Sequence, residues 1–158
     1  MANVFSGSEI VGFGIEIERN GRDFYNTLAA KAQDAKAKDV FKFLEGEEEK
    51  HIAVFQKILE SVKEYEPPET YAGEYFAYMT MLAGEYVFTQ TDKGKEAAKK
   101  ITNDKEAIDL GIKFEKESII FYEGMKKAVP EIQADIVEKL VEQENTHLFK
   151  LLKLRNNI

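Results

Sequence analysis

Two short motifs place a histidine three residues after a glutamate, and together they use both histidines of the chain. The motifs are Glu48-x-x-His51 and Glu144-x-x-His147. On a helix this spacing brings the carboxylate and the imidazole to one face, so both side chains can reach the same metal ion or adjacent ions. One such motif alone is more often a surface ion pair or a packed core histidine. Two copies favour a metal site.

Both motifs belong to an internal repeat. The sequence GIEIERNGRDFY at 14–25 matches GIKFEKESIIFY at 111–122 with an offset of 97, and LEGEEEKHIAVF at 44–55 matches LVEQENTHLFKL at 140–151 with an offset of 96. The repeat makes Glu18 equivalent to Glu115 and Tyr25 equivalent to Tyr122. Two copies of one unit predict a pseudo-twofold axis, so a central site would take equivalent residues from both halves.

Charge balance links these residues to metal ions. Six polar side chains interrupt helix faces that are otherwise apolar or lined by small residues: Glu18, Glu48, His51, Glu115, Glu144 and His147. Buried carboxylates lose solvation energy, and four of them close together repel one another. Protons could neutralise them, but two divalent ions match four negative charges and leave the histidines as neutral nitrogen donors. We therefore expect these six residues to hold two metal ions.

Four long helices are needed to position the six residues. Apolar residues at alternating spacings of three and four predict helices from a capping box at Ser6 to about residue 33, from Asp34 to about residue 65, from Asn103 to about residue 129, and from Pro130 to the C-terminus. Short connections make each consecutive pair an antiparallel hairpin. The class is all-α, with residues 1–158 forming a single domain.

About 37 residues join the two hairpins, long enough to travel the height of a bundle, as in ferritin-like topologies. Within this crossover Tyr71, Tyr75, Tyr78 and Leu82 lie at helical spacing and predict one short helix that covers a flank of the bundle or forms a dimer contact. Glu85 lies in the same segment and is a possible additional metal ligand.

The surroundings of the six residues give further expectations. Small residues flank two of the glutamates on their own helix face, namely Gly14, Gly21, Gly111 and Ser118, and we expect them to leave room for ions and water. Tyr25 and Tyr122 lie two turns beyond Glu18 and Glu115, where they could hydrogen-bond into the site, donate electrons near it or pack in the core. Glutamates off this face are expected on a solvated surface: Glu16, Glu45, Glu47, Glu49, Glu117 and Glu142.

Composition excludes several classes of function. The absence of cysteine removes disulfides, thiol nucleophiles and thiolate metal sites. The net charge is −7, and the basic stretch KGKEAAKK has no interleaved aromatic residues, which makes nucleic acid an unexpected partner. No run of apolar residues approaches a membrane span, and no signal peptide is evident, so a cytoplasmic location is expected.

On these residues the chain resembles the ferritin-like superfamily, and within it the rubrerythrin-related di-iron carboxylate proteins. The resemblance rests on Glu18 in IEIERNGRDFY, on EEEKH and EQENTH, and on Glu115 in FEKESIIFY. A glutamate from each of two helices and a Glu-x-x-His pair from each of the other two form the ligand set of such bundles. The resemblance implies that Glu48 and Glu144 bridge two irons.

By the same resemblance, Glu18 and His51 are terminal ligands of one ion, and Glu115 and His147 of the other. Two departures from the family are evident. Full-length rubrerythrins carry a cysteine-bound iron in a rubredoxin domain, which a chain without cysteine cannot hold, so an external electron-donor protein is expected. Rubrerythrins also place a second glutamate where this chain has Ser118, which gives the simpler six-ligand pattern of ferritins.

Three functions follow as hypotheses. The first is an oxidoreductase, a homodimer by resemblance, that reduces hydrogen peroxide or dioxygen at two irons. The second is a ferroxidase or iron-storage protein, and the third is a metal-free helical interaction module. Manganese or a mixed pair suits the same ligands as iron.

Overall fold

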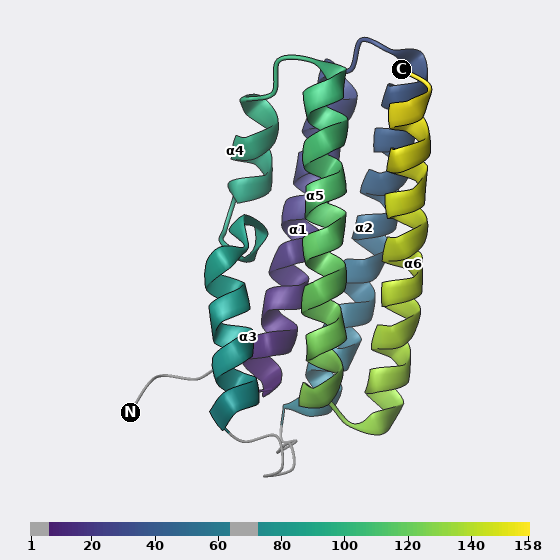
Figure 1. Ribbon diagram of the computed structural model, residues 1–158. Helices are drawn as coiled ribbons and strands as arrows, with labels where there is room; N and C mark the ends of the chain where they lie inside the picture. Colours follow the sequence, from purple (N-terminus) through teal and green to yellow (C-terminus); the bar gives the residue numbers. More distant parts are fainter. Residues whose placement is uncertain (1–6, 64–72) are drawn as a thin grey trace.

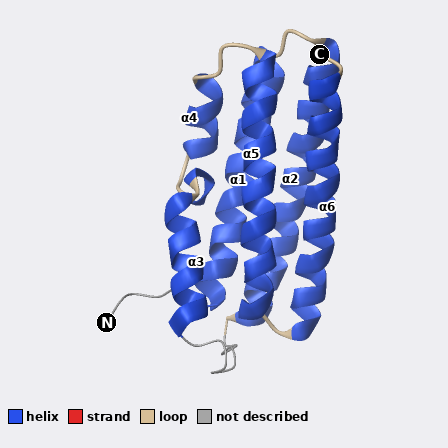
Figure 2. Cartoon of the chain, in the orientation of Figure 1, coloured by secondary structure: helices blue, strands red, loops and turns tan. Residues whose placement is uncertain are grey.

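The computed structural model describes residues 7–63 and 73–158, and within these ranges it contains helices and no β-strand (Figure 2). The helices are α1 (Gly7–Lys31), α2 (Ala35–Val62), α3 (Gly73–Glu85), α4 (Lys93–Lys99), α5 (Asp104–Met125) and α6 (Glu131–Asn156), with 3-10 turns η2 (Val87–Thr89) and η3 (Lys126–Ala128). The all-α class is confirmed. None of the described helices is long and apolar enough to cross a membrane.

Four of the helices form a bundle of two hairpins (Figure 1). The helices α1 and α2 pack along their length, as do α5 and α6. Along the bundle axis α1 and α6 run in one direction, and α2 and α5 run in the other (Figure 1). The α1–α2 turn, the α4–α5 turn and the C-terminus therefore meet at one end, as the predicted crossover requires.

Two polar caps fix the starts of α2 and α5. The Asp34 carboxylate accepts a hydrogen bond of 2.9 Å from the Ala37 amide, and the Asn103 side chain accepts one of 2.9 Å from the Glu106 amide. Both caps satisfy backbone donors that have no partner inside the helix. The predicted starts of these helices are thus confirmed. The predicted cap at Ser6 and the predicted end of the second helix near Tyr65 lie outside the described residues.

The crossover contains two helices, α3 and α4, where the sequence predicted one (Figure 1). The polar α4 sequence KGKEAAK lacks the apolar periodicity that would have predicted it. Buried Asn20 of α1 holds this segment: its amide nitrogen donates to the carbonyls of Phe88 and Gln90 at 2.7 and 2.6 Å, and its oxygen accepts from the Gly94 amide at 2.9 Å. One side chain therefore anchors the second half of the crossover to the bundle.

The contact between α1 and α4 predicts that Gly94→Ala destabilises the protein. An added Cβ at Gly94 would lie 2.0 Å from the Asn20 backbone carbonyl oxygen, so α4 must move away and stretch the three Asn20 hydrogen bonds. We expect a loss of about 2–3 kcal/mol in the free energy of unfolding, measured by urea denaturation.

Gly46→Ala is the matched control. It lies inside α2 with no atom within 4 Å of an added Cβ, so it should stabilise the protein by about 1 kcal/mol. Equal stability of the two variants would contradict the proposed packing of α4.

Candidate metal centre

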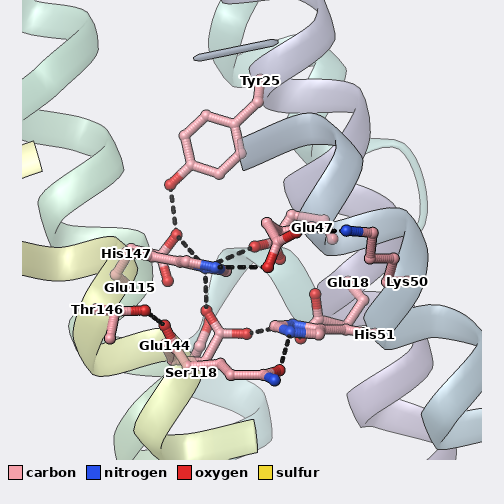
Figure 3. A network of polar contacts seen from close by, with 12 residues as sticks. Glu18, Tyr25, Glu47, Lys50, His51, Glu115, Ser118, Glu144, Thr146 and His147 are labelled. Carbon is pink, nitrogen blue, oxygen red and sulfur yellow. Dashed lines mark hydrogen bonds and ion pairs between the residues drawn. The ribbon is translucent and has the colours of Figure 1, made fainter. Parts of the chain in front are cut away.

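The six side chains expected to bind metal gather at the middle of the four-helix bundle, and Figure 3 labels all of them except Glu48. They are Glu18 from α1, Glu48 and His51 from α2, Glu115 from α5, and Glu144 and His147 from α6. All four glutamates are 0% exposed, and the two histidines are 1–2% exposed. On each helix these polar residues interrupt the buried face at the same level of the bundle. The prediction that they are buried together is confirmed.

The cluster divides into two overlapping groups that could each hold one ion. Ligand atoms of Glu18, Glu48, His51 and Glu144 lie within 4.8 Å of one another, and so do those of Glu48, Glu115, Glu144 and His147. The groups share Glu48 and Glu144 and are otherwise related by the internal repeat. The arrangement therefore offers two neighbouring positions, each with one terminal carboxylate and one imidazole.

Both histidines turn the Nδ1 atom toward the shared glutamate of α6. His51 Nδ1 lies 2.8 Å from Oε1 of Glu144, and His147 Nδ1 lies 3.1 Å from Oε2 of the same carboxylate. The rings are nearly parallel, with an interplanar angle of 14°. Each oxygen of Glu144 thus faces one Nδ1 atom, an arrangement in which a bridging carboxylate and two imidazoles can serve adjacent ions.

The two tyrosines hydrogen-bond into the cluster, but each reaches the glutamate of the opposite hairpin. Tyr25 donates to Oε1 of Glu115 at 2.6 Å (Figure 3). Tyr122 donates to Oε1 of Glu18 at 2.8 Å. Helical side chains point back toward the N-terminus, so each tyrosine extends toward the cluster from two turns away. Because α1 and α5 are antiparallel, the two hydroxyls approach from opposite ends of the bundle.

Four buried carboxylate oxygens have no hydrogen-bond partner among the described residues. They are Oε2 of Glu18, both oxygens of Glu48, and Oε2 of Glu115. A buried polar atom without a partner is unfavourable, and a carboxylate oxygen is a normal ligand for iron and manganese. These oxygens belong to Glu18 and Glu115, each found in one of the two groups, and to Glu48, which both groups share. The residues present therefore fit a pair of divalent ions.

Without metal ions, protons would have to balance the buried charge. Burial, reinforced by the charge of Glu144, raises the pKa of Glu48 and Glu115 well above the usual range and also raises that of Glu18. Burial opposes the ionisation of Glu144 as well, but hydrogen bonds with Glu115, His147 and His51 hold its pKa well below the usual range.

His51 carries part of the balancing charge. Burial lowers its pKa, but the neighbouring Glu18 and Glu144 carboxylates outweigh burial and raise the pKa to about 11. The cluster is thus poised to exchange protons for cations.

The small residues do not all leave room for ions as expected. An added Cβ at Gly14 would meet Met125 and Phe55, and one at Gly111 would meet Leu151 and Tyr25, so neighbouring side chains fill both spaces. At Gly21 a Cβ would lie 2.6 Å from the Phe114 ring and 2.9 Å from Oε2 of Glu48, so this space is filled as well and borders the cluster. The expectation of open space at the three glycines was wrong.

Glu47 and Gln143, which were not predicted as part of the site, contact the outer Nε2 atoms of the histidines. His51 Nε2 lies 2.7 Å from Oε1 of Gln143, and His147 Nε2 lies 3.8 Å from Oε2 of Glu47. Glu47 is less solvated than expected, at 19% exposed. The internal repeat could have indicated both residues, because positions 47 and 143 are equivalent and each directly precedes the glutamate of a Glu-x-x-His motif. Exposed Glu85 is in none of the candidate metal groups.

Comparisons with known proteins agree with the geometry. A sequence model of the rubrerythrin family matches residues 9–155. A solved structure from Thermotoga maritima, described as a ferritin-like diiron-carboxylate protein, superposes with a TM-score of 0.70 at 24% identity and covers 99% of this chain and 98% of its own. That likeness establishes the shared fold. No protein of curated function matches the sequence.

The raised pKa values predict that metal ions stabilise the protein more at high pH. Glu18, Glu48 and Glu115 hold protons in the folded state above the reference pKa of 4.5, so their contribution to stability is lost as the pH rises through the folded pKa. Cations then replace protons with less competition. At about 100 times the Kd, Mn²⁺ should raise the Tm by about 5–10 °C near pH 8.

The increase in Tm should be smaller near about pH 5.5. Differential scanning calorimetry with and without Mn²⁺ at both pH values measures the difference. An increase that is equal or larger at the lower pH would contradict proton and metal competition.

Proposed function

Because the chain belongs to the rubrerythrin family, we propose that its buried cluster binds two iron ions and that the protein reduces hydrogen peroxide or dioxygen. The observation that carries the proposal is the set of four unpartnered, fully buried carboxylate oxygens, which two cations would satisfy together. Glu18 with His51 and Glu115 with His147 are the proposed terminal ligands, and Glu48 and Glu144 are the shared ones. Manganese or a mixed pair would fit the same donors.

The chemistry that a ferrous pair supplies when bound is two electrons, which with two protons convert one hydrogen peroxide into two water molecules. The bundle keeps this site almost free of solvent, because all six ligands are at most 2% exposed. On one side the covering is thin. Exposed Gln143 contacts His51 directly, and Phe43, which is 45% exposed, lies edge-on to the His147 ring. A small oxidant could approach between α2 and α6.

Tyr25 and Tyr122 orient the terminal carboxylates. Burial and the nearby carboxylates raise the pKa of both phenols well above the ordinary value, so the hydroxyls stay protonated and act as hydrogen-bond donors. Each donates to Oε1 of a terminal glutamate and leaves Oε2 of that glutamate without a hydrogen-bond partner. Metal binding would therefore use the oxygen that the tyrosine does not hold.

Ser118 keeps the proposed ligand set at six. Its hydroxyl donates to the Phe114 carbonyl at 2.9 Å within α5, so the side chain supplies no carboxylate to the centre. The electrons that restore the ferrous state would come from outside these 158 residues, which contain no cysteine to hold a further iron. A homodimer and a cytoplasmic location remain predictions.

Anaerobic reaction with peroxide tests the proposed function. Protein loaded with two Fe²⁺ per chain should be oxidised by one equivalent of hydrogen peroxide, followed by stopped-flow absorbance in the near ultraviolet. Glu48→Gln removes a shared carboxylate and should abolish stoichiometric oxidation. Exposed Glu49, paired with Arg22 at the surface, provides Glu49→Gln as a control that should react normally.

Failure of the loaded protein to react with peroxide would refute the oxidoreductase proposal. Rapid oxidation by dioxygen in a large hollow multimer, seen by sedimentation, would favour the ferroxidase and storage alternative. Protein that binds no metal would favour the interaction module.

Removing either tyrosine hydroxyl should weaken metal binding to a similar degree, because the two hydrogen bonds are related by the repeat. In Tyr25→Phe and Tyr122→Phe a terminal carboxylate oxygen loses its donor and the orientation that the donor imposes. We expect a loss of about 10-fold in affinity for Co²⁺ in each variant, measured by calorimetry. Unchanged affinity in both would show that the hydroxyls serve packing alone.

A further inference from the structure

We propose that the two metal positions differ in affinity, and that the Glu115/His147 position fills first because His147 faces anionic Glu47 while His51 faces neutral Gln143. This inference rests on the proposed function, since it concerns the same two ions. It makes Glu47 and Gln143 positioning residues that act on metal through the histidine rings. The asymmetry lies in a pair of positions that the internal repeat makes equivalent.

The His51 side of the centre is held by an uncharged hydrogen bond. His51 Nδ1 faces the cluster, and its Nε2–H donates to the Gln143 amide oxygen at 2.7 Å, so a metal ion would replace only the proton on Nδ1. This contact fixes the tautomer that leaves Nδ1 available for a metal ion. It adds no negative charge to the ring. The contact thus orients His51 without placing a charge behind the ring.

The His147 side faces a carboxylate instead. Oε2 of Glu47 lies 3.8 Å from Nε2, while Oε1 of the same carboxylate is 2.9 Å from the Lys50 ammonium. Lys50 is 75% exposed and Glu47 is 19% exposed, so solvent screens the ammonium more than the carboxylate. The equivalents of Glu47 and Lys50 in the other half are Gln143 and Thr146, both uncharged.

A negative charge behind a ligating imidazole favours a cation in front of it. The carboxylate attracts the ion directly, through the ring that separates them. The ligand types in the two inner groups are the same. Glu47 also lies within 4.8 Å of a His51 nitrogen, but it approaches His147 more closely, at 3.8 Å. Glu47 is therefore the feature that should decide which position fills first.

Zinc titration followed by NMR tests the order directly. The chain has two histidines, so ¹⁵N-histidine labelling gives two rings, which His51→Gln and His147→Gln variants assign. In the unmodified protein the first equivalent of Zn²⁺ should shift the His147 signals with the pattern of Nδ1 coordination, and the second should shift His51. Zinc is redox-inactive, so the result does not depend on peroxide chemistry.

Reciprocal substitutions change one partner at a time. Glu47→Gln gives both rings an amide, and should weaken the first binding step by about 10-fold and remove the order. Gln143→Glu gives both rings a carboxylate and should strengthen the second step by a similar factor, which also removes the order. Glu49→Gln, on the exposed face of α2, should leave both steps unchanged.

Simultaneous filling in the unmodified protein, filling of His51 first, or an order that survives Glu47→Gln would each overturn the inference and leave the proposed function intact. Zinc bound by the outer nitrogens, in the group Glu47, His51 and His147, would also overturn it. Failure to bind zinc at all would refute the metal centre itself.

Discussion

The electrostatic cost of burying four carboxylates and two imidazoles at one level of a small bundle governs the rest of this structure. Removing an unpaired carboxylate from water is expensive, and proximity adds repulsion. The cluster is tolerable only with protons or cations among the oxygens. Apolar side chains close the bundle on both sides of this level, with Phe41 and Phe55 of α2 fully buried. The surrounding core therefore holds the charges together and keeps solvent from separating them.

The long crossover determines how Tyr25 and Tyr122 contact the cluster. It makes α1 antiparallel to its repeat equivalent α5, so Tyr25 and Tyr122 approach from opposite ends and each contacts the glutamate of the other hairpin. With a short connection in place of the crossover, α1 and α5 would run parallel, and both tyrosines would lie on the same side of the cluster. The topology thus distributes hydrogen-bond donors evenly over the two terminal carboxylates, and ties the two hairpins together through the site.

Helical periodicity and the repeat were sufficient to predict the four long helices and the buried set of glutamates and histidines, because both depend on spacing along one helix. Contacts between helices were harder to predict from the sequence. The tyrosine partners depend on the direction of α5, and the spaces at Gly14 and Gly111 are filled by side chains from other helices. Helix α4 is held by Asn20 and by close backbone contact, not by an apolar stripe. Such features require the tertiary structure.

The repeat is kept among the six buried polar residues at the centre and is broken in the layer around them. The central residues are identical in type in both halves, because an unmatched charge among them would be buried without compensation. One layer outward, half-buried Glu47 stands opposite exposed Gln143, where water can screen a charge difference. A pseudo-symmetric bundle could therefore distinguish the two proposed metal positions without disturbing the charge balance at its centre. A difference in charge between the two halves costs the least free energy at the partially exposed residues behind the histidines.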